Sequence, residues 1–180
     1  MEEKFRKITT KGRSEMKPGE IGLQAAINEF MQQIEKNLID EEATQHGLFS
    51  FILTKKQRFQ INKICQEQDW VDPQEKGITL TKQYFQHVLS QRSEKDKVNS
   101  TDCAAIIANA FNIKSKIAIN KKRYEGDTER EQQALLFCAE ETITSTNISN
   151  LYGVAVIEVS LKEITPITAY HARGAKIKAF

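Results

Sequence analysis

The spacing of apolar residues along the first part of the chain predicts two helices separated by a strand. In residues 21–38 the apolar positions fall on one face of an amphipathic helix, and residues 55–68 repeat that arrangement. The short apolar run 47–53 lies between them and is typical of a strand. Residues 1–20 are charged and include two glycines and a proline, so we expect a mobile arm there.

Pro73 marks the best internal boundary in this sequence. Proline lacks an N–H donor and drives the preceding residue, here Asp72, towards an extended conformation. We therefore predict an amino-terminal arm with a mainly helical accessory region in residues 1–72, followed by an α+β domain in residues 73–180.

Two helices and a strand are predicted after this boundary. Residues 79–92 place apolar side chains on one face, and residues 103–111 are apolar almost all round, as in a helix buried beneath a sheet. The polar run 99–102 just before the second helix offers several N-cap side chains. From 113 to 120 apolar and polar residues alternate, which is typical of a strand with a basic outer face.

The remainder of the chain is predicted to be mainly β-structure. Residues 128–141 fit two interpretations, a helix opened by a capping box or a buried strand, and we favour the strand. A polar segment, 142–150, leads into an antiparallel hairpin of residues 152–161 and 165–173, and a last short strand is expected at 175–180. The predicted fold class is α+β, with helices packed on a small antiparallel sheet and a helical extension at the amino terminus.

Length and composition are those of a soluble globular protein. The 180 residues carry a formal net charge of +2, and 39% of them are hydrophobic, which suffices for a domain with a buried core. No window approaches the roughly 18 consecutive apolar residues of a membrane span, and the amino terminus lacks the apolar core of a secretory signal. We therefore expect a cytoplasmic protein without a signal peptide or a membrane span.

Neither a metal site nor a cofactor site is visible in the sequence. The three cysteines are widely spaced without a CxxC pair, which favours buried free thiols over a catalytic nucleophile. The three histidines show no metal-ligand spacing, and the glycine-rich loops that bind nucleotide phosphates are absent. We therefore expect no metal and no cofactor.

Polar side chains suited to chemistry gather near the end of the predicted hairpin. Thr168, Tyr170, His171 and Arg173 follow one another closely in the chain. Because side chains alternate along a strand, Thr168 and Tyr170 share one face and His171 points to the other. A further histidine, His87, lies on the polar flank of the first helix of the α+β domain.

Three segments carry a resemblance to a known group of enzymes: ITLTKQYFQHVLSQR at 78–92, VIEV at 156–159 and ITAY at 167–170. With the order of two helices followed by antiparallel strands, they resemble the barnase, EndoU, colicin and RelE-like nuclease superfamily. The resemblance covers roughly residues 77–180. This group includes bacterial toxins of contact-dependent inhibition and phage-encoded relatives.

The resemblance implies a ribonuclease of the bacterial toxin type and gives roles to four residues. His87 would be the catalytic histidine of the helix, and Thr168 and Tyr170 would form the catalytic strand end. His171 is the candidate for a second catalytic histidine. The implied substrate is transfer RNA or another structured RNA, and an immunity protein or antitoxin would be the neutralising partner.

The residues permit this chemistry without a metal. RNA carries its own nucleophile, the 2′-hydroxyl, so cleavage needs a base, an acid and cations that offset charge at the phosphorus. Histidine can take or give a proton near neutrality. The cations that we predict to bind the substrate are Arg92, Lys114, Lys116 and Arg173.

Each of these residues also has a plain structural interpretation. His87 can be an ordinary solvated side chain, Thr168 and Tyr170 are good strand formers, and lysines protect sheet edges from pairing. The alternative function is a non-enzymatic effector that binds a protein through its amino-terminal helices and the strand at 48–53. A transferase acting in a similar cleft would need a ligand-binding signature, which the sequence lacks.

Overall fold

The computed structural model describes residues 16–36, 49–120, 133–143, 148 and 150–180, which form five helices and six strands. The helices are α2 (Met16–Glu35), α3 (Lys55–Glu67), α4 (Lys82–Asp96), α5 (Ser100–Ala110) and α6 (Gly174–Lys178). The strands are β1 (Phe49–Ile52), β2 (Gly77–Leu80), β3 (Lys116–Ile119), β4 (Ala134–Cys138), β5 (Tyr152–Val159) and β6 (Ile164–Ala172). The predicted α+β class is confirmed. None of the helices in these ranges is long and apolar enough to cross a membrane.

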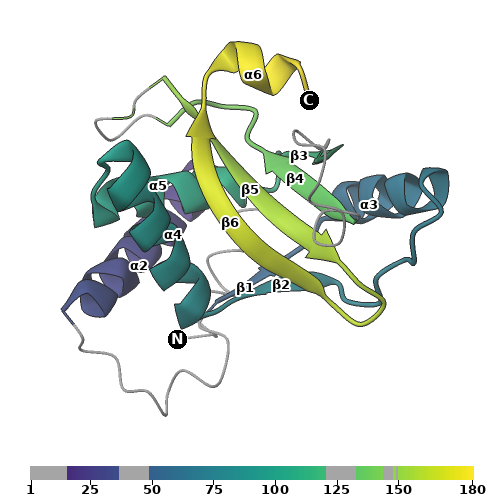
Figure 1. Cartoon of the computed structure of the whole chain (residues 1–180), viewed down its shortest axis with the longest axis horizontal. Helices are drawn as coiled ribbons and strands as arrows, with labels where there is room; N and C mark the ends of the chain where they lie inside the picture. The colour runs from purple at the N-terminus through teal and green to yellow at the C-terminus, as the bar shows by residue number, and fades with distance from the viewer. Residues whose placement is uncertain (1–15, 37–48, 121–132, 144–147, 149) are drawn as a thin grey trace.

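The strands form two antiparallel sheets that lie next to each other (Figure 1). β3, β4, β5 and β6 make a four-stranded meander in chain order, and β1 pairs with β2. β2 also contacts β6, the edge strand of the meander. A bulge leaves Ile167 without an opposite residue on β5, so that Pro166 and Ala169 face the same side of the sheet.

The two faces of the meander have different surroundings. Phe137 and Ala169 point to one face, which we call the helix face, where they join the main core with residues of α2, α4 and α5. Leu136 and Val154 point to the opposite face, where Ile177 of α6 packs against them, and we call it the α6 face. Figure 1 shows α2, α4 and α5 gathered on the same side of the sheet and α6 near the end of β6.

α5 is the central helix of the core, and nine of its eleven residues are buried. It packs between α2 and the helix face of the sheet. At Gly153 of β5, an added Cβ would lie 2.5 Å from the carbonyl oxygen of Ile106 and 2.9 Å from the nitrogen of Ala110. Only a residue without a side chain allows helix and strand to approach this closely.

Aromatic side chains from both sides of Pro73 meet in this core. The ring of Phe51 in β1 lies 5.7 Å from Phe111 at the end of α5 and 5.9 Å from Phe137 in β4, measured between centroids. β1, from before the predicted boundary, pairs with β2, from after it. The described parts of the two predicted regions therefore share one hydrophobic core.

Most predicted elements are confirmed. The strand at 47–53, the helix at 55–68, the buried helix at 103–111 and the hairpin of 152–161 with 165–173 correspond to β1, α3, α5 and the β5–β6 pair. Within 128–141, the strand interpretation is confirmed for β4, all five residues of which are buried.

Two predicted boundaries in the middle of the chain are wrong. Residues 77–80 form β2 and not the start of a helix, because the Thr81 side chain accepts a hydrogen bond from the Tyr84 N–H and begins α4 there. β3 begins at Lys116, later than the alternating pattern predicts. The reason is a turn just before it, held by the side chain and carbonyl oxygens of Asn112.

The two ends of the described chain also differ from prediction. α2 begins at Met16, earlier than predicted. Pro18 does not prevent this start, because it lies in the first turn, where a missing N–H breaks no intrahelical hydrogen bond. Residues 175–180, predicted to be a strand, form α6 and the residues that end it. Alanine and lysine favour a helix, and the Ile177 N–H donates to the Arg173 carbonyl.

Several predictions concern residues outside the described part of the chain. They are the mobile arm over residues 1–15, the capping box that starts at Thr128 and much of the polar segment 142–150.

The three cysteines are free and buried, as predicted. Burial raises the pKa of Cys103 to about 12, with the carboxylate of Asp102 adding to the effect, and burial raises the pKa of Cys138 to about 11. Burial also raises the pKa of Cys65. A thiol must ionise before it can act as a nucleophile, so these three are poor candidates for catalysis near neutral pH.

Replacing Gly153 with alanine should destabilise the protein. The new Cβ would meet backbone atoms of α5, which cannot move without displacing the helix, and overpacking of this kind costs about 1–3 kcal/mol. In the matched control, Gly174→Ala, the new Cβ would meet only Cε2 of Tyr152, at 3.4 Å. Chemical unfolding followed by circular dichroism should show a lower midpoint for the first variant alone. Equal midpoints would contradict the close approach of α5 to β5.

Stability should fall at alkaline pH, and Cys103 should account for part of that fall. In the unfolded chain this thiol ionises near pH 9.0, whereas in the folded protein its pKa is about 12. The unfolded state therefore loses its proton first, so the free energy of unfolding should decrease as the pH rises from about 9 towards about 12. Guanidinium titrations across this range should show a smaller decrease for Cys103→Ala than for the wild type. The same decrease in both proteins would exclude a buried neutral thiol.

Candidate functional site

One side of α4 runs along β6 and brings polar groups of the two elements together. Tyr84, Val88, Arg92 and Asp96 are spaced four residues apart and so lie on one stripe of the helix. At the start of this stripe the Tyr84 hydroxyl donates a hydrogen bond to the Thr168 carbonyl at 3.3 Å. Burial raises the pKa of Tyr84 far above its usual value, so the hydroxyl remains a neutral donor.

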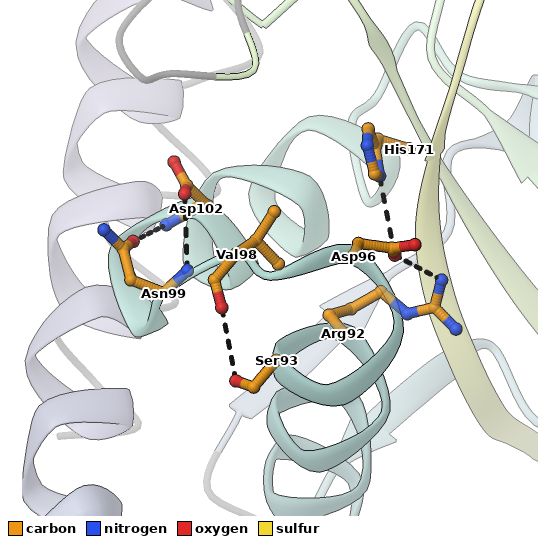
Figure 2. Close-up of polar contacts among 7 residues, drawn as sticks. All are labelled: Arg92, Ser93, Asp96, Val98, Asn99, Asp102 and His171. Atoms are coloured by element: carbon orange, nitrogen blue, oxygen red, sulfur yellow. Dashed lines mark hydrogen bonds and ion pairs between the residues drawn. The ribbon is translucent and has the colours of Figure 1, made fainter.

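At the other end of the stripe Arg92, Asp96 and His171 form a group that we call the His171 cluster (Figure 2). Nη1 of Arg92 lies 2.7 Å from Oδ2 of Asp96, a short charge-assisted hydrogen bond. Nδ1 of His171 lies 3.9 Å from the same oxygen, which is longer than a hydrogen bond. The side chains of Arg92, Asp96 and His171 are 14%, 25% and 21% exposed, so the cluster is sheltered but still accessible.

The corner between α4 and α5 holds Asp96 in position. Asp96 is the last residue of α4, and Lys97 follows it in the left-handed conformation, with φ of 58°. Oγ of Ser93 donates to the Val98 carbonyl at 3.2 Å, and Asn99 then caps α5 (Figure 2). These contacts direct the end of α4 towards β6.

Helix electrostatics alone do not explain an acid at this position. The carboxyl end of a helix carries partial negative charge, so an acid in the last turn is disfavoured by about 0.3–1 kcal/mol. The ion pair with Arg92 offsets this cost.

A carboxylate beside an imidazole is suited to proton transfer. When the carboxylate accepts the Nδ1–H, it selects the tautomer in which Nε2 can take a proton from a substrate. Nδ1 of His171 is buried without a hydrogen-bond partner in the described residues, so a small shift of the ring would complete this bond. Catalytic hydrogen bonds are often long before the substrate binds. In the described ranges, no three His, Cys, Asp or Glu residues are grouped so that they could hold a metal ion.

The four predicted catalytic residues do not meet at one point. His87 lies on an exposed flank of α4, and its side chain makes no hydrogen bond or ion pair with another described residue. Thr168 and Tyr170 point to the α6 face and His171 to the helix face, in agreement with the predicted alternation. On the α6 face the Lys176 ammonium lies 4.7 Å from the centroid of the Tyr170 ring. The His171 cluster thus contains one of the four.

The predicted substrate-binding cations are also dispersed. Arg92 belongs to the His171 cluster and is bound to its carboxylate. Lys114 and Lys116 each pair with a glutamate, at 2.9 Å and 3.5 Å. Arg173 is exposed and occupies the N-cap position of α6.

Asp96 is the residue of the His171 cluster that the sequence analysis did not single out. The helix predicted at 79–92 ends before it, whereas α4 continues for another turn. The pairing of Arg92 with Asp96, four residues apart, could have been found from the spacing of ion pairs on helices. No such signal exists for the contact between Asp96 and His171, because the two residues are 75 positions apart in the chain.

The strand suggested as a partner-binding surface is mostly buried. Phe49, Phe51 and Leu53 are each 2% exposed, because their side chains point into the core. Ile52, on the outer side of β1, is 41% exposed. Among the described residues of this segment, the apolar side chains mainly stabilise the fold.

Comparison with known proteins assigns neither a family nor a function to the chain. No family model, no curated protein and no solved structure matches the chain. The His171 cluster therefore has to be interpreted from its own chemistry.

Proposed function

We propose that the protein is a metal-independent endoribonuclease that cleaves RNA at the His171 cluster. His171 carries the proton, Asp96 orients the imidazole ring and Arg92 holds Asp96. The observation that supports this proposal is an imidazole facing a carboxylate that an arginine already holds in place.

We also propose that the fold is of the barnase, EndoU, colicin and RelE-like type that the sequence resembles. This is supported by the order of elements, since α4 and α5 are followed by the antiparallel meander from β3 to β6. On this interpretation the protein is a toxin-type enzyme that acts in a bacterial cytoplasm on transfer RNA or another structured RNA. An immunity protein or antitoxin would neutralise it.

The reaction requires only RNA, the imidazole and water. Nε2 of His171 takes the proton of the 2′-hydroxyl, the 2′-oxygen forms a bond to the adjacent phosphorus, and the bond from phosphorus to the 5′-oxygen breaks. Water delivers a proton to the departing 5′-oxygen, and the imidazolium returns its proton to solvent. The products are a 2′,3′-cyclic phosphate and a free 5′-hydroxyl.

A cation beside the cluster would offset the extra negative charge at phosphorus. Arg173 is exposed and lies two residues after His171 in the chain. A guanidinium can bind two phosphate oxygens at once. Because Arg92 is already bound to Asp96, we assign the phosphate contact to Arg173.

Replacing His171 with asparagine should lower the rate of RNA cleavage by roughly 10²–10⁴-fold, the usual contribution of a positioned proton carrier. The measurement is cleavage of total RNA and of transfer RNA in the presence of EDTA, with analysis of the new ends for 2′,3′-cyclic phosphate. His87→Asn is the matched substitution on the exposed flank of α4, and it should have a much smaller effect.

Two results would contradict this proposal. Cleavage that requires His87 but survives the loss of His171 would move the site to the other flank of α4, as the family resemblance implies. A wild-type protein that cleaves no RNA, or cleaves it only when a metal is available, would exclude a metal-independent ribonuclease.

Replacing Asp96 with asparagine should lower kcat by up to roughly 10⁴-fold and leave KM nearly unchanged, because the amide keeps the shape but no longer selects the productive tautomer. Arg92→Gln should have a smaller effect in the same direction, since Asp96 is still present. Steady-state kinetics on a fluorogenic oligoribonucleotide separate the two constants. A higher KM with an unchanged kcat for Arg92→Gln would instead support the substrate-binding role predicted from the sequence.

A further inference from the structure

We infer that a groove on the α6 face binds a nucleotide of the RNA strand away from the bond that is cut; this inference rests on the proposed ribonuclease function. The groove lies between α6 and the neighbouring strands β3 and β4 and has a volume of about 620 Å³. Small-ligand sites usually measure about 300–1,000 Å³. The groove is therefore large enough for a nucleotide.

Apolar and aromatic side chains form part of the inner surface of the groove. Among the residues that line it are Ala118 of β3, Cys138 of β4 and Phe180 after α6. Tyr152 lines the groove at the start of β5, and its ring approaches the first turn of α6 at Gly174. Surfaces of this kind bind the flat faces of nucleobases with little regard to sequence.

Charged side chains stand around the opening. Lys116 and Lys178 supply ammonium groups, and Glu140 lies 3.5 Å from the Lys116 ammonium. The Lys116 side chain is 68% exposed, so it can turn towards a phosphate. A carboxylate can accept a hydrogen bond from the exocyclic amino group of a base. An acidic peptide would use only the ammonium groups, whereas RNA would use both the ammonium groups, through its phosphates, and the flat apolar surfaces, through its bases. The combination therefore favours RNA.

The groove opens at the same end of the sheet as the proposed catalytic site. The strand register places His171 on β6, Gly153 on β5, Cys138 on β4 and Lys116 on β3 in nearly one row. Three strand spacings separate the first from the last, or roughly 14 Å. The two sites use opposite faces of the sheet, and the exposed Arg173 lies where these faces meet at the end of β6. A short RNA segment passing around this end could contact both sites.

Binding can be tested without cleavage by using a fluorescein-labelled oligonucleotide whose 2′-oxygens are methylated, since these oxygens cannot attack the phosphorus. Fluorescence anisotropy with the full chain should show binding. Phe180→Ala should weaken it roughly 5- to 150-fold, the loss expected for one stacked base. In the matched control, Phe59→Ala removes a phenylalanine of α3 that is 69% exposed and should leave Kd unchanged.

The salt dependence of binding tests the lysines. The double variant Lys116→Ala/Lys178→Ala should reduce the slope of log K against log salt by about 1.4, because each phosphate contact to a single strand contributes about 0.7. Lys76→Ala/Lys162→Ala removes the same charge at the opposite end of the sheet, near the turn between β5 and β6, and should leave the slope unchanged.

Equal affinities and slopes for the groove variants and their controls would overturn the inference. Polyglutamate that competes as well as RNA would also overturn it, because the groove would then bind any polyanion. The proposed function can fail independently of this inference. If the wild-type protein binds the methylated oligonucleotide through the groove but cleaves no ordinary RNA, the binding role of the groove stands and the ribonuclease activity is excluded.

Discussion

The close packing of α5 against β5 organises the core of the protein. Gly153 leaves room for the backbone of α5, and Asn109 of α5 links the two elements through its side chain. Its Oδ1 accepts from the Gly153 N–H at 2.7 Å, and its Nδ2 donates to the Glu141 carbonyl at 3.1 Å. With α5 held against the sheet, α2 covers its outer side and the core closes around it.

The geometry of the His171 cluster follows from this packing. α4 leads directly into the capped start of α5, so the position of α5 sets where α4 ends. The hydrogen bond from Tyr84 to Thr168 then aligns the beginning of α4 with β6. Because successive helix residues are about 100° apart, a rotation of α4 by one residue would turn Asp96 away from His171. The site thus depends on contacts made at some distance from it.

β6 contributes to both faces of the sheet, and its bulge determines which residues reach which face. When the register of a strand shifts by one residue, each side chain of the strand moves to the opposite face of the sheet. The extra residue, Ile167, keeps Pro166 and Ala169 on the helix face and thereby directs His171 towards α4. Tyr170 points to the α6 face, beside the apolar residues on which α6 packs. One strand therefore connects the His171 cluster with the face that carries the groove.

Local sequence patterns were enough to predict the elements whose signals come from neighbouring residues. Periodicity and capping predicted the helix at 55–68, the buried helix at 103–111 and the terminal hairpin, and strand alternation predicted that Tyr170 and His171 face opposite ways. These features could be read locally because hydrogen bonding and burial within one element depend on spacing along the chain.

Contacts between groups that are distant in the chain could be found only in the folded protein. Gln57 completes the capping box of α3, a local arrangement, but its amide also donates to the Asn112 carbonyl at 2.8 Å, 55 residues away. The contact of Asp96 with His171 also joins residues that are far apart in the chain. So does the hydrophobic core, which contains residues from both sides of Pro73. They depend on how whole helices pack on the sheet, and no pattern within either segment carries that information.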